Sequence, residues 1–251
     1  MYSVTQRIKT IKQPRGGYIN PKAFEVTELN DGIELFENEN IHSSIMGLVV
    51  DYLTRYMIGA TAKDAFSISL LGSDIIKERK KAENLLEDIK GLDDKSIINA
   101  CKLSGYDVCF RAGIIGYKPV DTINPNSETI YNIRTMVNRG IKFFDQYGPI
   151  TLDGFVFVGG YTDIVSSGDG DFLTKDTLWD FKVSKDKPKS AHTLQLLMYY
   201  IMGKRSINKE FETVKNIGIF NPRLNVVYSL EINKIPQEII DTVSKEVIGY
   251  K

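Results

Sequence analysis

The sequence has few of the residues that hold disulfide-rich folds or metal clusters together. Two cysteines among 251 residues, Cys101 and Cys109, are too few for a disulfide framework or for a cluster held by four thiolates. No apolar run reaches the roughly 18 residues that a membrane-spanning helix needs, and the candidate at residues 45–50 ends at Asp51. No apolar segment follows the first residues, so we expect no signal peptide. We therefore expect a cytoplasmic protein without membrane contact.

The sequence also lacks an excess of charge of either sign. Lysine and arginine together number 32, and so do aspartate and glutamate. We therefore do not expect the chain to coat a nucleic acid through bulk charge, although a local basic groove stays open. Charged residues make up 25% and hydrophobic residues 42%, which is typical of globular proteins and excludes disordered, collagen-like and coiled-coil chains.

No internal repeat, low-complexity tract or long linker divides the chain, which favours a single domain over residues 1–251. Residues 1–147 are predicted to be mainly helical and residues 148–251 to be rich in strands. Apolar residues three and four apart predict a helix over 43–57, capped by Ser43 or Ser44, and a second over 127–147. The expected fold class is α/β, with a helical first half.

After Pro149 the apolar pattern changes from the helical period to that of strands. The predicted elements are strands over 150–158, 161–165 and 177–184, a helix over 190–202, a hairpin of 217–220 with 226–230, and a helix from Pro236 to about 247. Residues 166–171 are predicted to form a hairpin turn. A calcium loop is not expected there, because Leu173 stands where a ligand should be.

The strand predicted over 177–184 carries an acid and a lysine on one face. Because side chains alternate along a strand, Asp180 and Lys182 project side by side, and Trp179 and Phe181 project to the other face. The acid can hold a divalent cation, and the lysine can orient a water molecule beside it. Three other acid-x-lysine matches lie in polar segments that need no function: residues 78–80, 88–90 and 93–95.

A second carboxylate, Asp163, lies near the preceding predicted strand. If the two strands pair, Asp163 and Asp180 can converge on one ion, and oxygen ligands of this kind suit magnesium or manganese. The alternative is that Asp163 closes a turn and that Asp180 pairs with Lys182.

On the next helix, Gln195 and Tyr199 are four residues apart and share a face. Together they can grip a phosphate or position a nucleotide. The alternative is a half-buried tyrosine beside a solvated glutamine.

Three segments, taken in order, resemble the motifs of the RecB-like branch of the PD-(D/E)XK nuclease superfamily. Residues 160–163 are similar to its G-x-x-D motif, residues 180–182 to (D/E)-x-K, and residues 195–199 to Q-x-x-x-Y. The resemblance covers roughly residues 150–233. It implies a restriction-endonuclease-like core, in which helices flank a mixed central sheet, and a metal-dependent nuclease that hydrolyses DNA phosphodiester bonds, in the first place as an exonuclease.

The resemblance also implies a role for each matching residue. Asp163 and Asp180 would bind Mg²⁺ or Mn²⁺, with the Phe181 carbonyl as a third protein ligand. Lys182 would orient the attacking water or stabilise the pentacovalent phosphate. Gln195 and Tyr199 would hold the substrate strand.

Two further positions extend the predicted site. Lys185 begins a lysine-rich segment where DNA phosphates could dock, although a solvated loop explains these lysines equally well. Many families of the branch carry a histidine on an early helix as an additional metal ligand. His42 is the candidate by position, with a capping or solvent-exposed histidine as the alternative, and His192 is the other candidate.

The chain departs from some members of the branch. Its two cysteines cannot hold an iron–sulfur cluster, and it has no G-x-x-x-x-G-K-[ST] motif, so a helicase motor would have to come from a protein partner. The sequence leaves the oligomeric state open. The alternatives to an exonuclease are a sequence-specific restriction-type endonuclease and a catalytically silent module that binds nucleic acid or protein; the intact acids and lysine argue against the silent module.

Overall fold

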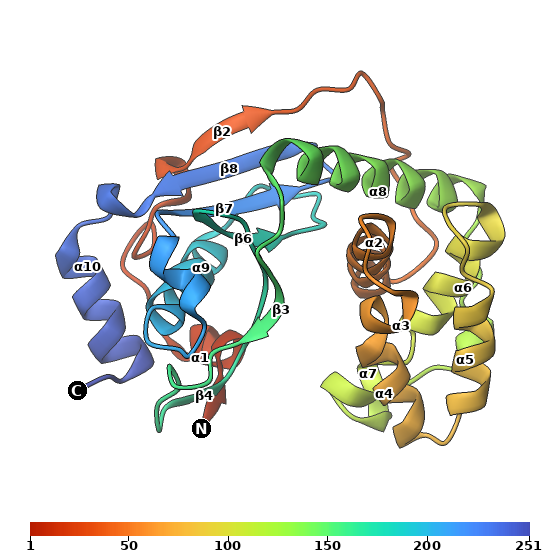
Figure 1. The fold of residues 1–251 in the computed structure, drawn as a ribbon, viewed down its shortest axis with the longest axis horizontal. Helices are drawn as coiled ribbons and strands as arrows, with labels where there is room; N and C mark the ends of the chain where they lie inside the picture. Colours follow the sequence, from red (N-terminus) through yellow and green to blue (C-terminus); the bar gives the residue numbers. More distant parts are fainter. The chain divides into compact units, whose positions relative to one another are not determined.

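The computed structural model describes residues 1–251 and builds its main sheet from both ends of the chain (Figure 1). One unit, here called the sheet unit, comprises Met1–Leu29 and Asp145–Lys251; the other, the helical unit, comprises Asn30–Phe144. The sequence placed the first 29 residues with the helical half. They belong to the sheet unit because β2 (Glu25–Glu28) pairs with β8 (Val226–Glu231), about 200 residues later.

The main sheet has six strands in the order β2-β8-β7-β6-β5-β3. Its remaining strands are β3 (Leu152–Val156), β5 (Asp169–Leu173), β6 (Thr177–Phe181) and β7 (Asn216–Asn221). Only β6 and β7 pair in parallel, and the other neighbours are antiparallel. The fold is thus α/β with a mixed sheet, as predicted. A separate ladder joins β1 (Tyr2–Ser3) to β4 (Val165–Ser167).

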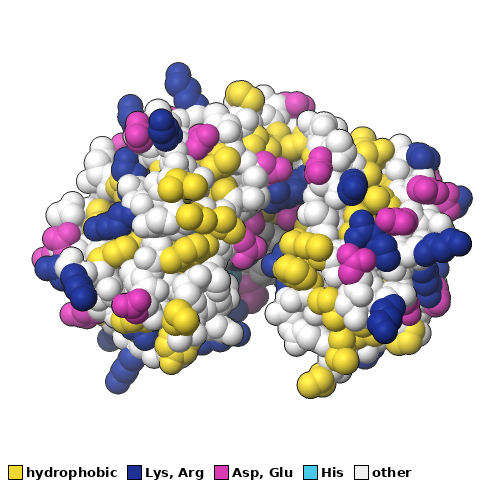
Figure 2. Space-filling model, turned by 60° about the horizontal axis from the view of Figure 1, so that its bottom comes forward, with side chains coloured by type: hydrophobic (Ala, Val, Ile, Leu, Met, Phe, Trp, Pro, Cys, Tyr) yellow, Lys and Arg dark blue, Asp and Glu magenta, His cyan; other side chains and the backbone are white.

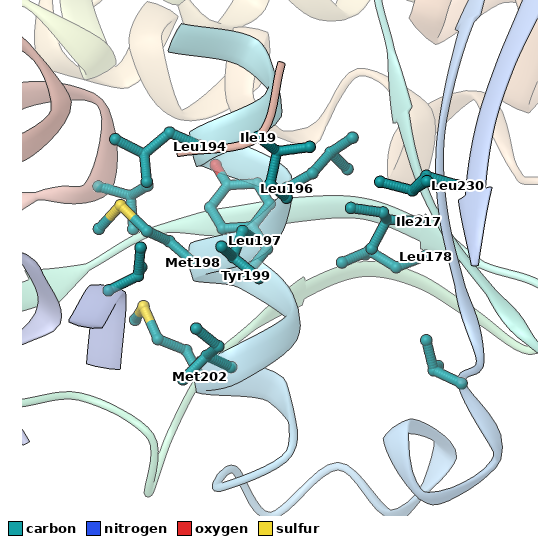
Figure 3. Packing of buried hydrophobic residues seen from close by; sticks show 14 of the residues in the cluster. Ile19, Leu178, Leu194, Leu196, Leu197, Met198, Tyr199, Met202, Ile217 and Leu230 are labelled. Atoms are coloured by element: carbon teal, nitrogen blue, oxygen red, sulfur yellow. The ribbon is translucent and has the colours of Figure 1, made fainter. Parts of the chain in front are cut away.

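The parallel pair requires a crossover connection, and α9 (Ser190–Gly203) supplies it. Leu178, Ile217 and Leu230 of three neighbouring strands lie in the same buried cluster as α9 residues such as Leu197 (Figure 3). The outer side of α9 contacts α1 (Val4–Thr10) and the C-terminal segment. Since α9 is covered on both sides, most of its residues are buried.

The C-terminal helix is not regular throughout. The predicted helix over 236–247 consists of α10 (Gln237–Thr242) followed by a π-helical stretch, Val243–Ile248. The Arg7 guanidinium donates hydrogen bonds to the carbonyls of Glu246 and Val247, each at 2.9 Å, and Thr162 Oγ1 donates to the Ile248 carbonyl at 2.6 Å. These donors satisfy carbonyl groups at the end of the helix.

The face of β6 that points away from α9 packs around Trp179. Its ring lies 5.4 Å from that of Tyr147 and covers Gly218 of β7, where a Cβ atom would lie 2.3 Å from the indole. The indole Nε1 donates to Thr174 Oγ1 at 3.0 Å, which satisfies its buried N–H group. Both faces of β6 are therefore buried at its centre.

The helical unit contains α2 to α7 and most of α8. Their bounds are α2 (Ser43–Met57), α3 (Ala62–Ala65), α4 (Ser67–Ile75), α5 (Arg79–Glu87), α6 (Asp94–Ser104), α7 (Asp107–Arg111) and α8 (Ser127–Tyr147). The predicted bounds of α2 and α8 are confirmed. Gly140 lets α8 approach α2, because a Cβ atom there would lie 2.7 Å from Thr54 Cγ2.

The cap of α2 differs from the prediction. The N-cap residue is His42 rather than Ser43 or Ser44, and its Nδ1 accepts a hydrogen bond from the Ser44 amide at 3.3 Å. An imidazole nitrogen can replace a hydroxyl here because both accept from the free N–H groups of a first turn.

The surface matches the balanced composition. On the face shown in Figure 2, lysine and arginine side chains are mixed with aspartate and glutamate side chains, and neither sign dominates. None of the helices combines the length and the apolarity needed to cross a bilayer.

Candidate functional site

The side chains of Asp180, on β6, and Lys182, just after it, project to the face of the sheet that α9 covers. Leu178, two residues before Asp180, belongs to the core under α9, and strand alternation directs Asp180 the same way. Asp180 is 4% exposed. The ammonium of Lys182 lies 3.1 Å from Asp180 Oδ1, to which it donates a hydrogen bond, and 3.0 Å from Oδ2. That Oδ2 atom is buried and accepts no hydrogen bond.

Gln195 and Tyr199 extend this pair into a line of four polar side chains. Lys182 Nζ donates to Gln195 Oε1 at 3.4 Å, and Gln195 Nε2 donates to the Tyr199 hydroxyl at 3.0 Å. The four residues come from β6, the turn after it and one face of α9. The structure thus brings together four of the residues that the sequence selected, although Tyr199 is fully buried rather than half-buried.

Two aspartates that the sequence assigned to a turn lie on β5. The hairpin turn predicted over 166–171 is wrong, because residues from Asp169 onward pair with both β3 and β6. Gly170 permits this pairing: a Cβ atom there would lie 2.4 Å from the ring of Phe155 on β3. The glycine that suggested a turn is instead required by a cross-strand aromatic ring.

Asp171 faces the same side of the sheet as Asp180. The register pairs Phe172 with Trp179, so the next antiparallel positions are Asp171 and Asp180, whose side chains share a face. Asp171 Oδ2 accepts a hydrogen bond from the Phe181 amide at 2.7 Å. A carboxylate thereby takes the place of a strand carbonyl at the end of the ladder.

These carboxylates set the protonation of their neighbours. Burial lowers the pKa of Lys182, but the charges of Asp180, Asp171 and Asp169 outweigh it, and the pKa lies above its ordinary value. Burial, and then the same three charges, raise the pKa of Tyr199 well above its usual range. Lys182 is therefore an ammonium and Tyr199 a neutral phenol at physiological pH.

His192, on the first turn of α9, also lies near this group. Its Nδ1 accepts a hydrogen bond from the Lys189 amide at 3.2 Å. Burial and the Lys182 ammonium lower the pKa of His192, although the Asp180 charge opposes them. The imidazole is therefore neutral at physiological pH.

Asp163, Lys185 and His42 come from other segments of the chain. Asp163 is exposed in the loop before β4, and β4 pairs with β1 rather than with the strand that carries Asp180. The pairing that was expected to join Asp163 to Asp180 is therefore absent. Lys185 is exposed in the loop after β6, and His42 caps α2 in the helical unit. The main chain of Phe181 lies in the site through its amide.

Gly160 of the first motif has a packing role. A Cβ atom there would lie 2.2 Å from the Met202 carbonyl oxygen, so only glycine lets this loop approach the end of α9.

The donor set fits a hard divalent cation. Asp180 Oδ2 is a buried anionic oxygen that accepts no aligned hydrogen bond, with the Lys182 ammonium 3.0 Å away, and two further carboxylates act electrostatically on the same lysine. Magnesium and manganese prefer such oxygens, and magnesium commonly takes one or two carboxylates with water in its other positions. No three His, Cys, Asp or Glu side chains converge into a ready-made metal site. Asp180 and Asp171, which share a face of the sheet, are the residues that could hold such a cation.

The comparisons with known proteins add no relative to this description. No protein-family model, no curated protein and no solved structure matches the chain.

Proposed function

We propose that this chain is a divalent-metal-dependent nuclease that hydrolyses DNA phosphodiester bonds on a restriction-endonuclease-like core. The supporting observation is the line from Asp180 through Lys182 and Gln195 to Tyr199, in which a buried carboxylate oxygen accepts no hydrogen bond. These four residues also belong to the two segments, residues 180–182 and 195–199, that resemble motifs of RecB-like nucleases.

Asp180 and Asp171 would hold Mg²⁺ or Mn²⁺, since they occupy opposite positions on one face of the sheet. Asp163 and the Phe181 carbonyl remain further ligands proposed from the motifs. When bound, the ion would supply a water of lowered pKa and neutralise charge on the phosphate.

The remaining side chains bind and orient the substrate. Lys182, charged at neutral pH, would donate to a phosphate oxygen or hold the attacking water. Gln195 keeps the ammonium in place through its 3.4 Å contact, and Tyr199 fixes the glutamine. Lys185, exposed beyond β6, would meet the phosphates of the DNA strand. An exonuclease, alone or with a helicase or another protein partner, fits these parts best.

The test is cleavage of linear and covalently closed circular DNA by the purified chain, with Mg²⁺, Mn²⁺ or EDTA. Asp180→Asn and Lys182→Met are the site variants. Asp88→Asn and Lys90→Met are matched controls, because residues 88–90 form another aspartate-x-lysine segment and lie in the helical unit.

We expect metal-dependent loss of linear DNA that both site variants abolish and both controls retain. Cutting of the circle would change the assignment to an endonuclease. No cleavage of either substrate by the unaltered chain, or equal cleavage by Asp180→Asn, would overturn the proposal and favour a binding module.

A further inference from the structure

The helical unit holds a cavity that the proposed nuclease site does not use. Its volume is about 600 Å³, and all its lining residues lie between Asn40 and Ile123, within the helical unit. That volume is in the range of small-molecule sites. The walls are largely aliphatic and come from α2, α7 and the turns beside them, with Ile45, Leu48, Val108 and Ile123 among the lining residues.

One hydroxyl in this wall has no partner. Ser104, at the end of α6, is 1% exposed, and its Oγ makes no hydrogen bond. Buried hydroxyls are normally satisfied because desolvation without a hydrogen bond costs free energy. Ser104 belongs to the cavity wall, and a small shift of its buried hydroxyl towards the cavity would let a polar atom of a bound molecule supply the missing hydrogen bond.

The buried acid of the wall is already satisfied. Asp107 accepts hydrogen bonds from the hydroxyls of Tyr52, at 2.6 Å, and Ser69, and the Arg111 guanidinium lies 3.5 Å from its Oδ2. Asp107 and Arg111 form an ion pair. The third charged side chain among the lining residues is Lys118, which is an ammonium. The cavity therefore complements an anion.

His42 adds a donor to the same wall. Its Nδ1 accepts a hydrogen bond from the Ser44 amide, so the neutral ring carries its proton on Nε2. The lining residues include no phenylalanine, tyrosine or tryptophan ring, so the wall offers a nucleobase no large aromatic platform.

We propose that this cavity binds a small aliphatic carboxylate. Its apolar body would lie against the aliphatic walls, its carboxylate would meet Lys118 and the donors beside it, and the Ser104 hydroxyl would hydrogen-bond to one of its oxygens. The proposal is independent of the nuclease function, since no lining residue belongs to the Asp180 site.

The test is calorimetric titration of the full chain with three probes of equal length: octanoate, 1-octanol and octylammonium. We expect octanoate to bind at millimolar concentrations, octanol to bind about fivefold more weakly or less, and octylammonium to show no heat. Equal affinities for the three probes, or no binding of octanoate, would overturn the proposal.

Variants locate the binding. Lys118→Gln should weaken octanoate about fivefold and leave octanol unchanged, whereas Lys63→Gln, outside the cavity wall, should change neither. Ser104→Leu should narrow the cavity at its wall, remove the hydroxyl donor and weaken binding of octanoate. Lys118 is exposed, so its variant keeps the test decisive if Ser104→Leu does not fold. Unchanged octanoate affinity in Lys118→Gln would contradict the proposal.

Discussion

Each unit buries an aspartate, and the two differ in how their oxygens are satisfied. Asp107 in the helical unit is 1% exposed and Asp180 in the sheet unit is 4% exposed. The Asp107 carboxylate receives donors from Tyr52, Ser69 and Arg111. Asp180 has Lys182 beside it, and its Oδ2 accepts no hydrogen bond. The two acids are thus similarly buried but differ in the number of donors that reach them, and the acid with fewer donors is the candidate functional one.

The charged groups around Asp107 and Asp180 also differ. Asp107 is accompanied by a guanidinium, and burial raises the pKa of its carboxyl while its hydrogen bonds oppose the shift. Around Asp180, three carboxylates act on the ammonium of Lys182. One acid thus meets one guanidinium in the first group, whereas three carboxylates act on one ammonium in the second.

The largest expected effect separates the two aspartates by activity. On the proposed assignment, Asp180→Asn should lower the rate of DNA hydrolysis by at least about 100-fold, because it removes a proposed anionic metal ligand. Asp107→Asn should keep the activity and lower the free energy of unfolding by about 1–3 kcal/mol, since a buried hydroxyl loses its acceptor. Steady-state cleavage assays measure the rate of hydrolysis, and urea unfolding measures the free energy of unfolding. The comparison fails if Asp107→Asn is the variant that loses activity.

The ion pair at the sheet site provides a second contrast. Lys182→Met leaves the Asp180 carboxylate buried without its cation and should destabilise the fold by about 2 kcal/mol; this is below the range for fully buried pairs, because Lys182 is 29% exposed. Adding Asp180→Asn should restore most of that loss. Additive effects in urea unfolding of the single and double variants would show that the two side chains are not coupled.

A third experiment compares two proposed metal ligands: Asp171, proposed from its position in the sheet, and Asp163, proposed from its sequence motif. Asp171→Asn should weaken Mn²⁺ binding about tenfold, because Asp171 lies opposite Asp180. Asp163→Asn should weaken it less, because its loop does not pair with β6. Calorimetric Mn²⁺ titration ranks the two. A larger loss for Asp163→Asn would mean that this loop moves to the site when metal binds.

The smallest effect concerns an acid whose pKa shifts the other way from that of Asp107. Hydrogen bonds from Arg139 lower the pKa of Asp31, although burial opposes them. A lowered pKa stabilises the fold above the unfolded pKa, and the stabilisation is lost as the pH falls below about 4 towards the folded pKa. Arg139→Met should flatten this acid dependence, a change of about 1 kcal/mol between pH 7 and the folded pKa. An unchanged acid limb in urea unfolding at successive pH values would contradict the assignment.

Local patterns were sufficient for much of the fold. The period of apolar residues fixed the bounds of α2 and α8, and strand alternation put Asp180 and Lys182 on one face. The spacing of Gln195 and Tyr199 was also informative, because residues four apart on a helix meet the same neighbour.

Long-range pairing was not accessible in the same way. Asp169–Leu173 looked like a turn, because the ring of Phe155 that requires Gly170 lies 15 positions earlier on another strand. The assignment of Met1–Leu29 to the sheet unit depends on pairing between β2 and β8. The cap of α2 was missed because histidine is an uncommon N-cap residue.

The hydrogen bond from the Phe181 amide to Asp171 has a spectroscopic consequence. An amide proton held at 2.7 Å by a carboxylate resonates at a frequency that depends on the charge and position of that carboxylate. Any cation or phosphate that engages Asp171 would shift this resonance before chemistry begins. The Phe181 amide is therefore an internal NMR reporter, and a single ¹⁵N-labelled phenylalanine sample can follow ligand arrival at the sheet without a DNA substrate.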